Sequence, residues 1–315
     1  MVENNKASIN VCDADLNNNK LPAYWVTGFS DAESSFSVRI AETTRKAGWR
    51  IMPIFSIELH IRDLSILKKI QVFFNVGSIY IRKREGRVTA IYSVQSVQAL
   101  NNVIIPHFLE YPLLTQKKAD FELFKLIINL MNKKEHLNIK GITKIVSIRA
   151  CMNKGLTGKL KNAFSVISSI KRPIIDSHVI KDPMWLTGFV DGEGCFYIKI
   201  KKSIISKPQI SLVFSISQHA RDLLLFKYII EYLNCGVIEQ VFTRPDSITL
   251  VVYNYKDIID KILPFFMTNP LLSKKSLDFT SFNKVAMLKK NGISLTKEDL
   301  ILISEIKSNM NTGRK

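Results

Sequence analysis

The sequence predicts an α+β protein built from two similar halves, and three observations support that class. Several blocks of sequence recur in the same order, at an offset that falls from 160 residues (Thr27 to Thr187) to 158 (Ile148 to Ile306). Within each half, some segments alternate apolar and polar residues, as half-buried strands do. Other segments carry apolar residues at helical spacing. A duplicated half favours a pseudo-twofold structure, equivalent to a homodimer fused into one chain.

Both halves are expected to follow the order αββαββα, with further helices at the end of each. Turn residues mark the two hairpins, Glu85-Gly86 in the first half and Pro245-Asp246 in the second. In the first half the elements are expected over about 21–32, 35–40, 50–59, 62–73, 77–83, 87–95, 97–109, 115–131 and 142–152. In the second half they are expected over about 183–192, 195–201, 208–218, 221–233, 236–243, 247–254, 255–266, 273–290 and 297–309. The halves cover 20–156 and 183–315, and a basic linker covers 157–182.

Composition fits two cores and indicates a partner. The chain has 315 residues, of which 46% are hydrophobic. Its 45 Lys and Arg residues against 27 Asp and Glu residues give a net charge of +18, which predicts a polyanionic partner, nucleic acid before an anionic membrane. No apolar run approaches the ~20 residues of a membrane span, and the N-terminus resembles neither a secretory signal nor a good transit peptide. The four cysteines are widely spaced, which favours a reducing compartment and no zinc site: Cys12, Cys151, Cys195 and Cys235.

The first strand of each half predicts a sheet with one apolar face and one polar, basic face. Ser35 and Arg39 alternate with Phe36, and Tyr197 and Lys199 follow the same pattern in the second half. Exposed basic residues can also serve only to block strand pairing, but their recurrence in both halves favours contact with nucleic acid. Two strands of about ten residues would together follow roughly 20 base pairs of duplex DNA. The predicted DNA-binding residues are Ser35, Ser37, Arg39, Arg50, Tyr80, Arg82, Arg84, Cys195, Tyr197, Lys199, Lys201 and Lys207.

A motif with the pattern Thr-Gly-Phe-x-Asp-(Ala/Gly)-Glu ends the first predicted helix of each half, at 27–33 and 187–193. Small residues stand four apart in each motif and therefore share one helix face. Two such faces allow helices to pack with their backbones almost touching. The residues that form this predicted helix interface are Gly28, Ala32, Gly188 and Gly192.

Each motif helix ends in an acid, Glu33 or Glu193. A carboxylate is unfavourable at a helix C-terminus, where the helix dipole is negative. If the helices pack side by side, the two carboxylates come close together and need a counter-charge. A hard divalent cation such as Mg²⁺ supplies it. The alternative is that both acids are exposed and without a role, but that does not account for the repetition of the acid beside the small residues.

The two motifs, Val26-Thr-Gly-Phe-Ser-Asp-Ala-Glu-Ser34 and Leu186-Thr-Gly-Phe-Val-Asp-Gly-Glu-Gly194, resemble those of single-chain LAGLIDADG homing endonucleases, especially the enzymes encoded in fungal mitochondrial introns. The resemblance covers nearly the whole chain. It implies two saddle-shaped antiparallel sheets packed through the motif helices. It also implies a mitochondrial monomer that uses divalent metal to cut a long asymmetric DNA duplex, with a staggered cut across the minor groove.

The resemblance also implies roles for particular residues. Glu33 and Glu193, with Ala32 and Gly192 beside them, correspond to the metal-binding positions, where Mg²⁺ supports cleavage and Ca²⁺ binding alone. Asp31 and Asp191 correspond to positions that hold the helix end and the interface. The other catalytic positions correspond to Gln218, Lys117 and Lys275.

This chain departs from the family pattern at two positions, both in the first half. Leu59 stands where the second half has Gln218, so the two half-sites are expected to be unequal. Ser34 follows Glu33 in the first motif, where the second motif has Gly194 after Glu193. Glycine at this position would ease a left-handed turn at the helix end. Two other functions stay open: an intron RNA maturase, and a DNA-binding protein without catalysis. The presence of both acids favours the nuclease.

Overall fold

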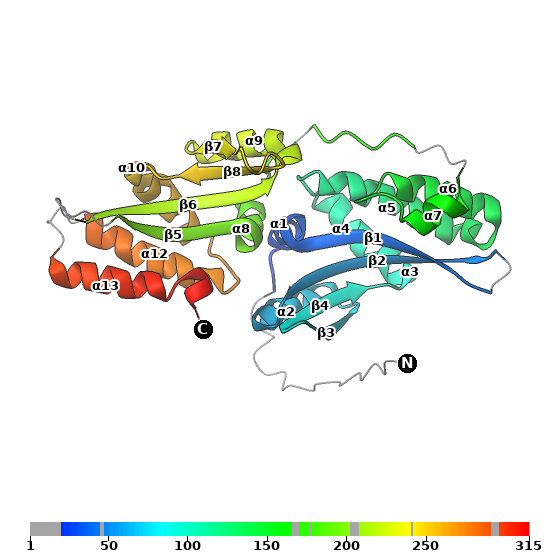
Figure 1. Ribbon diagram of the computed structural model, residues 1–315, viewed down its shortest axis with the longest axis horizontal. Coiled ribbons are helices and arrows are strands. Elements are labelled where there is room, and N and C mark those ends of the chain that lie inside the picture. Colours follow the sequence, from blue (N-terminus) through cyan, green and yellow to red (C-terminus); the bar gives the residue numbers. More distant parts are fainter. Residues whose placement is uncertain are drawn as a thin grey trace. The chain divides into compact units, whose positions relative to one another are not determined.

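The computed structural model describes residues 20–44, 47–165, 170–176, 178–201, 208–240, 242–290 and 296–314 (Figure 1). By its internal contacts the chain divides into two units. The first contains residues up to Val26, Glu33–Leu113 and Lys117–Ile175. The second contains Thr27–Ala32, Leu114–Gln116 and the residues from Asp176 onward. Two short segments of the first sequence repeat therefore belong to the second unit, and the predicted linker divides between the units after Ile175.

The helix α1 (Ala23–Glu33) opens the first repeat, and it contributes residues to both units. The strands that follow it form one sheet. One helix stands between the second and third strands in the sequence, and the other helices follow the fourth strand. The strands are β1 (Ser34–Glu42), β2 (Trp49–His60), β3 (Ser78–Arg84) and β4 (Arg87–Val94). The helices are α2 (Leu64–Phe74), α3 (Val97–Ala99), α4 (Ile105–Glu110), α5 (Lys117–Asn132), α6 (Ile139–Ala150) and α7 (Gly158–Ala163).

The second repeat follows the same order as far as its last long helix. Its strands are β5 (Gly194–Lys201), β6 (Gln209–His219), β7 (Val237–Gln240) and β8 (Ser247–Val252). Its helices are α8 (Pro183–Glu193), α9 (Leu223–Leu233), α10 (Tyr255–Asp257), α11 (Leu263–Thr268), α12 (Lys275–Lys290) and α13 (Lys297–Ser308). The α+β class and the duplicated order of elements are thereby confirmed.

Each unit contains a four-stranded antiparallel sheet, in the orders β1-β2-β4-β3 and β5-β6-β8-β7. The first strand of each repeat is therefore an edge strand. Equivalent pairs set the register, because Phe36 lies opposite Phe55 in one sheet and Phe196 opposite Phe214 in the other. A shift of one residue would turn every apolar side chain to the polar face, so this register fixes which side chains face solvent.

Helices cover one face of each sheet (Figure 1). A cluster of buried aromatic side chains fills the space between the sheet and these helices. The ring of Phe36 is surrounded by four other phenylalanine rings, with centroid distances of 5.1–5.6 Å. Phe196 occupies the same place in the second repeat and is surrounded in the same way. Both phenylalanines are buried, whereas Ser35 and Tyr197 on the opposite face are half-buried and Arg39 is exposed. The alternation in the sequence therefore identified the core face.

The helix expected over 97–109 is interrupted by a wider turn. Residues Leu100–Ile104 form a π-helical turn between α3 and α4, in which the Ile105 N–H donates to the Leu100 carbonyl oxygen. Pro106 explains the irregularity, because a proline ring clashes with the carbonyl group four residues earlier in a regular α-helix. The second repeat has the same turn at Ile258–Ile262, ahead of Pro264. Within the described part of the chain, no helix has the length and apolar character that crossing a membrane requires.

Candidate functional site

The first element of the candidate site is a close backbone approach at Gly28, inside the second unit. A β-carbon added at Gly28 would overlap the carbonyl oxygen of Trp185 and lie 2.8 Å from the Trp185 carbonyl carbon and 2.9 Å from the Phe189 nitrogen. Glycine is therefore required at this position for residues Thr27–Ala32 to lie against α8. Gly28 is one of the four small residues of the predicted helix interface, and here it contacts the backbone of α8.

Asp31 is a buried anchor for the segment before α5. Its carboxylate accepts hydrogen bonds from the N–H groups of Leu114 (2.8 Å) and Thr115 (3.1 Å), and from the Thr115 hydroxyl (2.6 Å). The indole Nε1–H of Trp185 donates a further bond at 2.9 Å. Four charge-assisted bonds to one buried carboxylate fix the end of the motif helix and position the residues that lead into α5.

Asp191 makes the equivalent contacts in the second repeat. It accepts from the N–H groups of Leu272 (2.8 Å) and Ser273 (3.2 Å), and from the Ser273 hydroxyl at 2.5 Å. Both aspartates therefore hold the segment ahead of the helix that begins with Lys117 in one repeat and Lys275 in the other. These contacts are structural ones, as expected for the first acid of each motif.

Asp222 is a second anchor for the segment before α5, and sequence reasoning did not identify it. Its carboxylate accepts a hydrogen bond of 2.6 Å from the Gln116 N–H within the second unit. Burial raises the pKa of this carboxyl, while the hydrogen bond from Gln116 and the charge of Arg221 oppose that change. The signal was the repeated Arg-Asp that follows the second strand, but the counterpart Asp63 is partly exposed and pairs with its neighbour Arg62 at 3.6 Å.

Glu193 and Gln218 come together at the end of α8. The Gln218 side chain donates from Nε2 to Glu193 Oε1 at 3.2 Å, and its own oxygen accepts from the His219 N–H at 2.9 Å. Gln218 is thus held by the backbone on one side and orients the carboxylate on the other. Leu59 occupies the corresponding strand position in the first repeat and has no polar group that could do the same for Glu33. The two acidic motifs consequently differ in their immediate surroundings.

Lys275 lies against the C-terminal turn of α8. Its ammonium group donates to the carbonyl oxygens of Gly192 (2.8 Å) and Val190 (2.9 Å). A cation at this end of a helix offsets the negative end of the dipole, which the acid at Glu193 would otherwise reinforce. Lys117 has the equivalent place as the first residue of α5, a helix of 16 residues like α12.

The expectation of a left-handed turn after the motif helix was wrong. Gly194 has φ −77° and ψ 155°, so the chain passes from α8 directly into extended backbone that any residue adopts. Glycine is favoured there by space, because an added β-carbon would lie 2.5 Å from Val190 Cγ1 and 2.8 Å from the Val190 carbonyl oxygen. In the first repeat Ser30 stands at the position of that valine and has one γ-atom fewer, which accompanies Ser34 in place of glycine.

The predicted DNA-binding residues of the first repeat share the face of the sheet opposite the core. Strand pairing places Arg39 opposite Met52, Arg82 opposite Thr89, and Arg84 opposite Arg87. Arg82 is held by an ion pair with Glu58 at 3.0 Å, and the Thr89 hydroxyl donates to the same carboxylate at 2.7 Å. Also on this face are Ser35, Ser37, Arg50 and the exposed Tyr80.

The second sheet presents a different set of side chains. The Lys199 ammonium lies 5.6 Å from the centre of the Tyr197 ring, a cation–π distance. Cys195 is half-buried, with its sulfur 3.6 Å from the Asn311 side-chain oxygen, and burial raises the pKa of its thiol. Lys201 is exposed at the end of the strand, and Lys207 lies outside the described residues.

The donors at the end of α8 suit a hard cation. They are the Glu193 carboxylate and backbone carbonyl groups such as that of Gly192, which are oxygen donors, while the Gln218 amide presents its nitrogen to Glu193 and orients that carboxylate. Within the described ranges, no cluster of three or more His, Cys, Asp and Glu side chains could enclose a metal alone. A metal bound at these donors would therefore complete its coordination with other oxygens, such as those of water or a phosphate.

Two repeated sheets with an acid-ended helix ahead of each define the LAGLIDADG fold. The family model described as LAGLIDADG endonuclease matches residues 26–128 and 186–286. The chain therefore belongs to the LAGLIDADG endonuclease family.

Solved structures and curated relatives agree with this assignment. The chain is 41% identical to the I-SmaMI homing endonuclease solved with cleaved DNA, with a TM-score of 0.90 over 95% of this chain and 99% of that one. It is 37% identical to "Probable intron-encoded endonuclease 2" of Neurospora crassa, over 91% of this chain and 64% of the relative. "Probable intron-encoded endonuclease 3" of the same fungus is also 37% identical, over 89% of this chain and 53% of the relative. The chain thus spans between about half and about two thirds of the length of these two curated relatives.

Proposed function

We propose that the chain is a site-specific DNA endonuclease that hydrolyses both strands of a long asymmetric duplex with a divalent metal, leaving a staggered cut. The convergence of Glu193, Gln218 and Lys275 at the end of one motif helix carries the proposal. This arrangement places a carboxylate, an orienting amide and a fixed positive charge within one small region. The similarity to I-SmaMI, solved with cleaved DNA and with uncleaved DNA in the presence of calcium ions, supports it.

Each residue has a distinct part in this chemistry. Glu33 and Glu193, with the backbone at Ala32 and Gly192, would hold the metal. Magnesium at such a site lowers the pKa of a bound water and stabilises a leaving oxygen. Gln218 holds the Glu193 carboxylate in one orientation. Lys275, and Lys117 in the first repeat, supply positive charge for a scissile phosphate.

The two basic sheet faces would bind the duplex. Their side chains include arginines and lysines that neutralise phosphates, and serines and tyrosines that present hydrogen-bonding groups to base edges. The net charge of +18 strengthens association with a polyanion. We further propose that one chain binds one duplex of about 20 base pairs. The name of one relative, "Uncharacterized mitochondrial protein RF1" of Saccharomyces cerevisiae, supports a mitochondrial location.

A cleavage selection tests the proposed function directly. The full chain is incubated with a randomised duplex library and Mg²⁺, and the cut products are sequenced. A single long site with staggered ends is expected. Recovery of no cut site, together with specific binding of the same library, would favour a DNA-binding protein without catalysis.

Binding to the selected duplex is expected to depend steeply on salt. If six or more phosphates are neutralised, log Kd should change against log[salt] with a slope of magnitude about 5 or more, because each contact releases counterions. Fluorescence anisotropy between 50 and 300 mM KCl, with Ca²⁺ in place of Mg²⁺, measures the slope. A slope near zero would remove phosphate contact as the basis of binding.

The selected site is expected to be asymmetric. Ser35, Ser37 and Arg39 on one sheet correspond to Cys195, Tyr197 and Lys199 on the other, so the two faces present different groups to DNA. Palindromes built from the left or the right half of the site should each be cut at least about tenfold more slowly than the site itself, since several mismatches accumulate in one half. Equal cleavage of either palindrome would show that the two halves read DNA alike.

A further inference from the structure

The block Ile148–Asn153, which recurs as Ile306–Asn311, has no part in the proposed chemistry. In both repeats it ends on an asparagine with left-handed backbone, Asn153 with φ 49° and Asn311 with φ 54°. Asparagine tolerates this conformation better than most residues. Each asparagine follows the last long helix of its repeat, so the same turn is built twice.

Each asparagine joins a buried aspartate to the first strand of its own sheet. The Asn153 N–H donates to Asp120 Oδ1 at 2.9 Å, and its side-chain Nδ2 donates to the Phe36 carbonyl oxygen at 2.9 Å. In the second repeat the Asn311 N–H donates to Asp278 at 3.0 Å, and Nδ2 donates to the Phe196 carbonyl oxygen at 2.9 Å. The aspartates lie in the first turn of α5 and α12.

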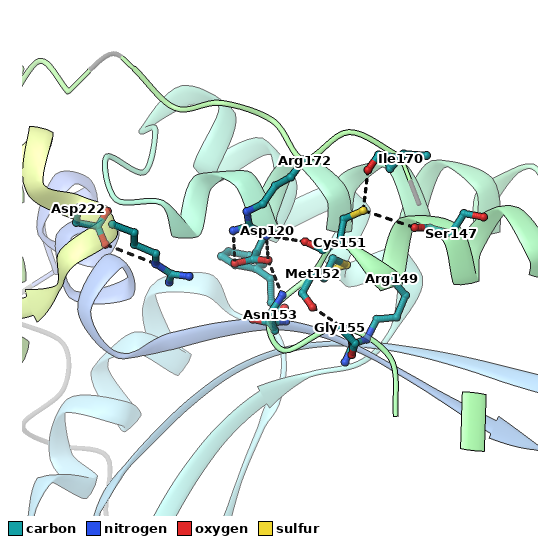
Figure 2. A network of polar contacts seen from close by, with 12 residues as sticks. Asp120, Ser147, Arg149, Cys151, Met152, Asn153, Gly155, Ile170, Arg172 and Asp222 are labelled. Carbon is teal, nitrogen blue, oxygen red and sulfur yellow. Dashed lines mark hydrogen bonds and ion pairs between the residues drawn. The ribbon is translucent and has the colours of Figure 1, made fainter. Parts of the chain in front are cut away.

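An arginine neutralises each aspartate, but the two arginines come from different parts of the chain. Arg172, in the predicted linker, binds Asp120 with two parallel bonds of 2.8 and 3.0 Å and also donates to the Cys151 carbonyl oxygen at 2.7 Å (Figure 2). Arg314, beyond the last long helix, binds Asp278 at 2.8 and 3.1 Å. Hydrogen bonding to Asp120 raises the pKa of Arg172. The aspartates are only 2% and 8% exposed, so each buried carboxylate depends on its arginine to neutralise its charge.

These contacts hold the strands that carry many of the predicted DNA-binding residues. β1 and β5 are edge strands, and each has a neighbour on one side only. The bond to the Phe36 or Phe196 carbonyl oxygen holds the open side of the strand, directly beside Ser35 and Ser37 or Cys195 and Tyr197 on the polar face. In the first repeat Arg149 adds a second bond, 3.0 Å from Nε to the Val38 carbonyl oxygen.

We propose that Arg172 and Arg314 are positioning residues for DNA recognition. Each acts through the aspartate and asparagine of its own repeat and fixes the edge strand that reads one half of the target. The inference rests on the proposed function. It also assigns the linker residue Arg172 a specific role in the first half, equivalent to that of Arg314 at the end of the second.

The test separates the two halves of the target. Arg39→Ala and Lys199→Ala first identify the base pairs that each sheet reads, by comparing cleavage of every single-base variant of the selected site. Arg172→Ala is then expected to lower discrimination about fivefold or more at base pairs of the first half, within the range of one good base contact, and to leave the second half unchanged. Arg314→Ala should do the reverse. Loss of discrimination in both halves alike, or in neither, would overturn the inference.

Matched controls and a measurement without DNA complete the test. Lys171→Ala, next to Arg172, and Lys307→Ala, in the last turn of α13, each remove one exposed positive charge and should change neither profile. Arg172→Lys and Arg314→Lys keep the charge but not the two-pronged bond, so they should give intermediate effects and serve if the alanine variants do not fold.

Hydrogen exchange of the protein alone should be about tenfold or more faster in β1 for Arg172→Ala and in β5 for Arg314→Ala, with the other strand unchanged. If the wild-type protein cuts no DNA, the proposed function fails, and the exchange data still test the strand contacts. Unchanged exchange in both strands would overturn the inference whatever the protein binds.

Discussion

Glu193→Gln is expected to abolish most cleavage while DNA binding is kept. Glutamine has the shape of glutamate, and it can still receive the hydrogen bond from Gln218 that lies at 3.2 Å in the structure. It lacks the negative charge that a divalent cation needs, so the cleavage rate with Mg²⁺ should fall by about 100-fold or more. Binding should be equal or tighter, because one negative charge that faces the phosphates is removed. Glu33→Gln should behave in the same way.

Single-turnover cleavage and anisotropy on the selected duplex measure the two effects separately. Glu231→Gln, in the exposed part of α9, is the matched control and should leave both unchanged. Gln218→Leu reproduces the environment of the first repeat, where Leu59 takes this position, and should slow cleavage less than Glu193→Gln does. Full cleavage by either Glu33→Gln or Glu193→Gln with Mg²⁺ would refute the metal-binding role of these acids.

Gly28→Ala is expected to have the largest effect on stability. The new methyl group would overlap the carbonyl oxygen of Trp185, and the atoms it meets next are also backbone atoms, which cannot turn aside as a flexible side chain can. Overpacking in protein interiors costs about 1–3 kcal/mol, and a backbone contact of this kind should reach or exceed the upper end of that range.

Urea unfolding monitored by circular dichroism measures the loss of free energy. Gly158→Ala is the control, because Gly158 is the first residue of α7 and no atom lies within 4 Å of an added β-carbon. Alanine there should be neutral or stabilising by up to about 1 kcal/mol. If Gly28→Ala unfolds at the same urea concentration as Gly158→Ala, the close approach at Gly28 is not needed for the fold.

The sequence carried enough information to predict the elements and their faces, because these depend on local period. Phe36 and Ser35 point to opposite sides of a strand in any antiparallel sheet, so alternation alone separates core from surface. Gln218 was found because the family pattern places a polar residue near the acidic motif, and the structure brings it to 3.2 Å from Glu193.

The contacts between distant parts of the chain could not be predicted, because no helical or strand periodicity connects the residues that form them. Asp120 and Arg172 are 52 residues apart, whereas Asp278 and Arg314 are 36 apart, so the two pairs share no spacing that a repeat could reveal. Asp222 binds a backbone group 106 residues away. The error at Ser34 has a similar origin, since glycine at position 194 is favoured by close contacts with the side chain and the carbonyl oxygen of Val190, and not by a left-handed backbone.

The π-helical turns at Leu100–Ile104 and Ile258–Ile262 show how one local residue pattern can shape both halves of the chain alike. Both copies stand directly before the Ile-Pro or Leu-Pro pair that begins the next helix. Each proline excludes a regular α-helical turn ahead of it, so the same residue pattern imposes the same irregularity twice. The two halves differ in the residues of their polar faces, but both need the same wider turn to bring the following helix back onto the sheet.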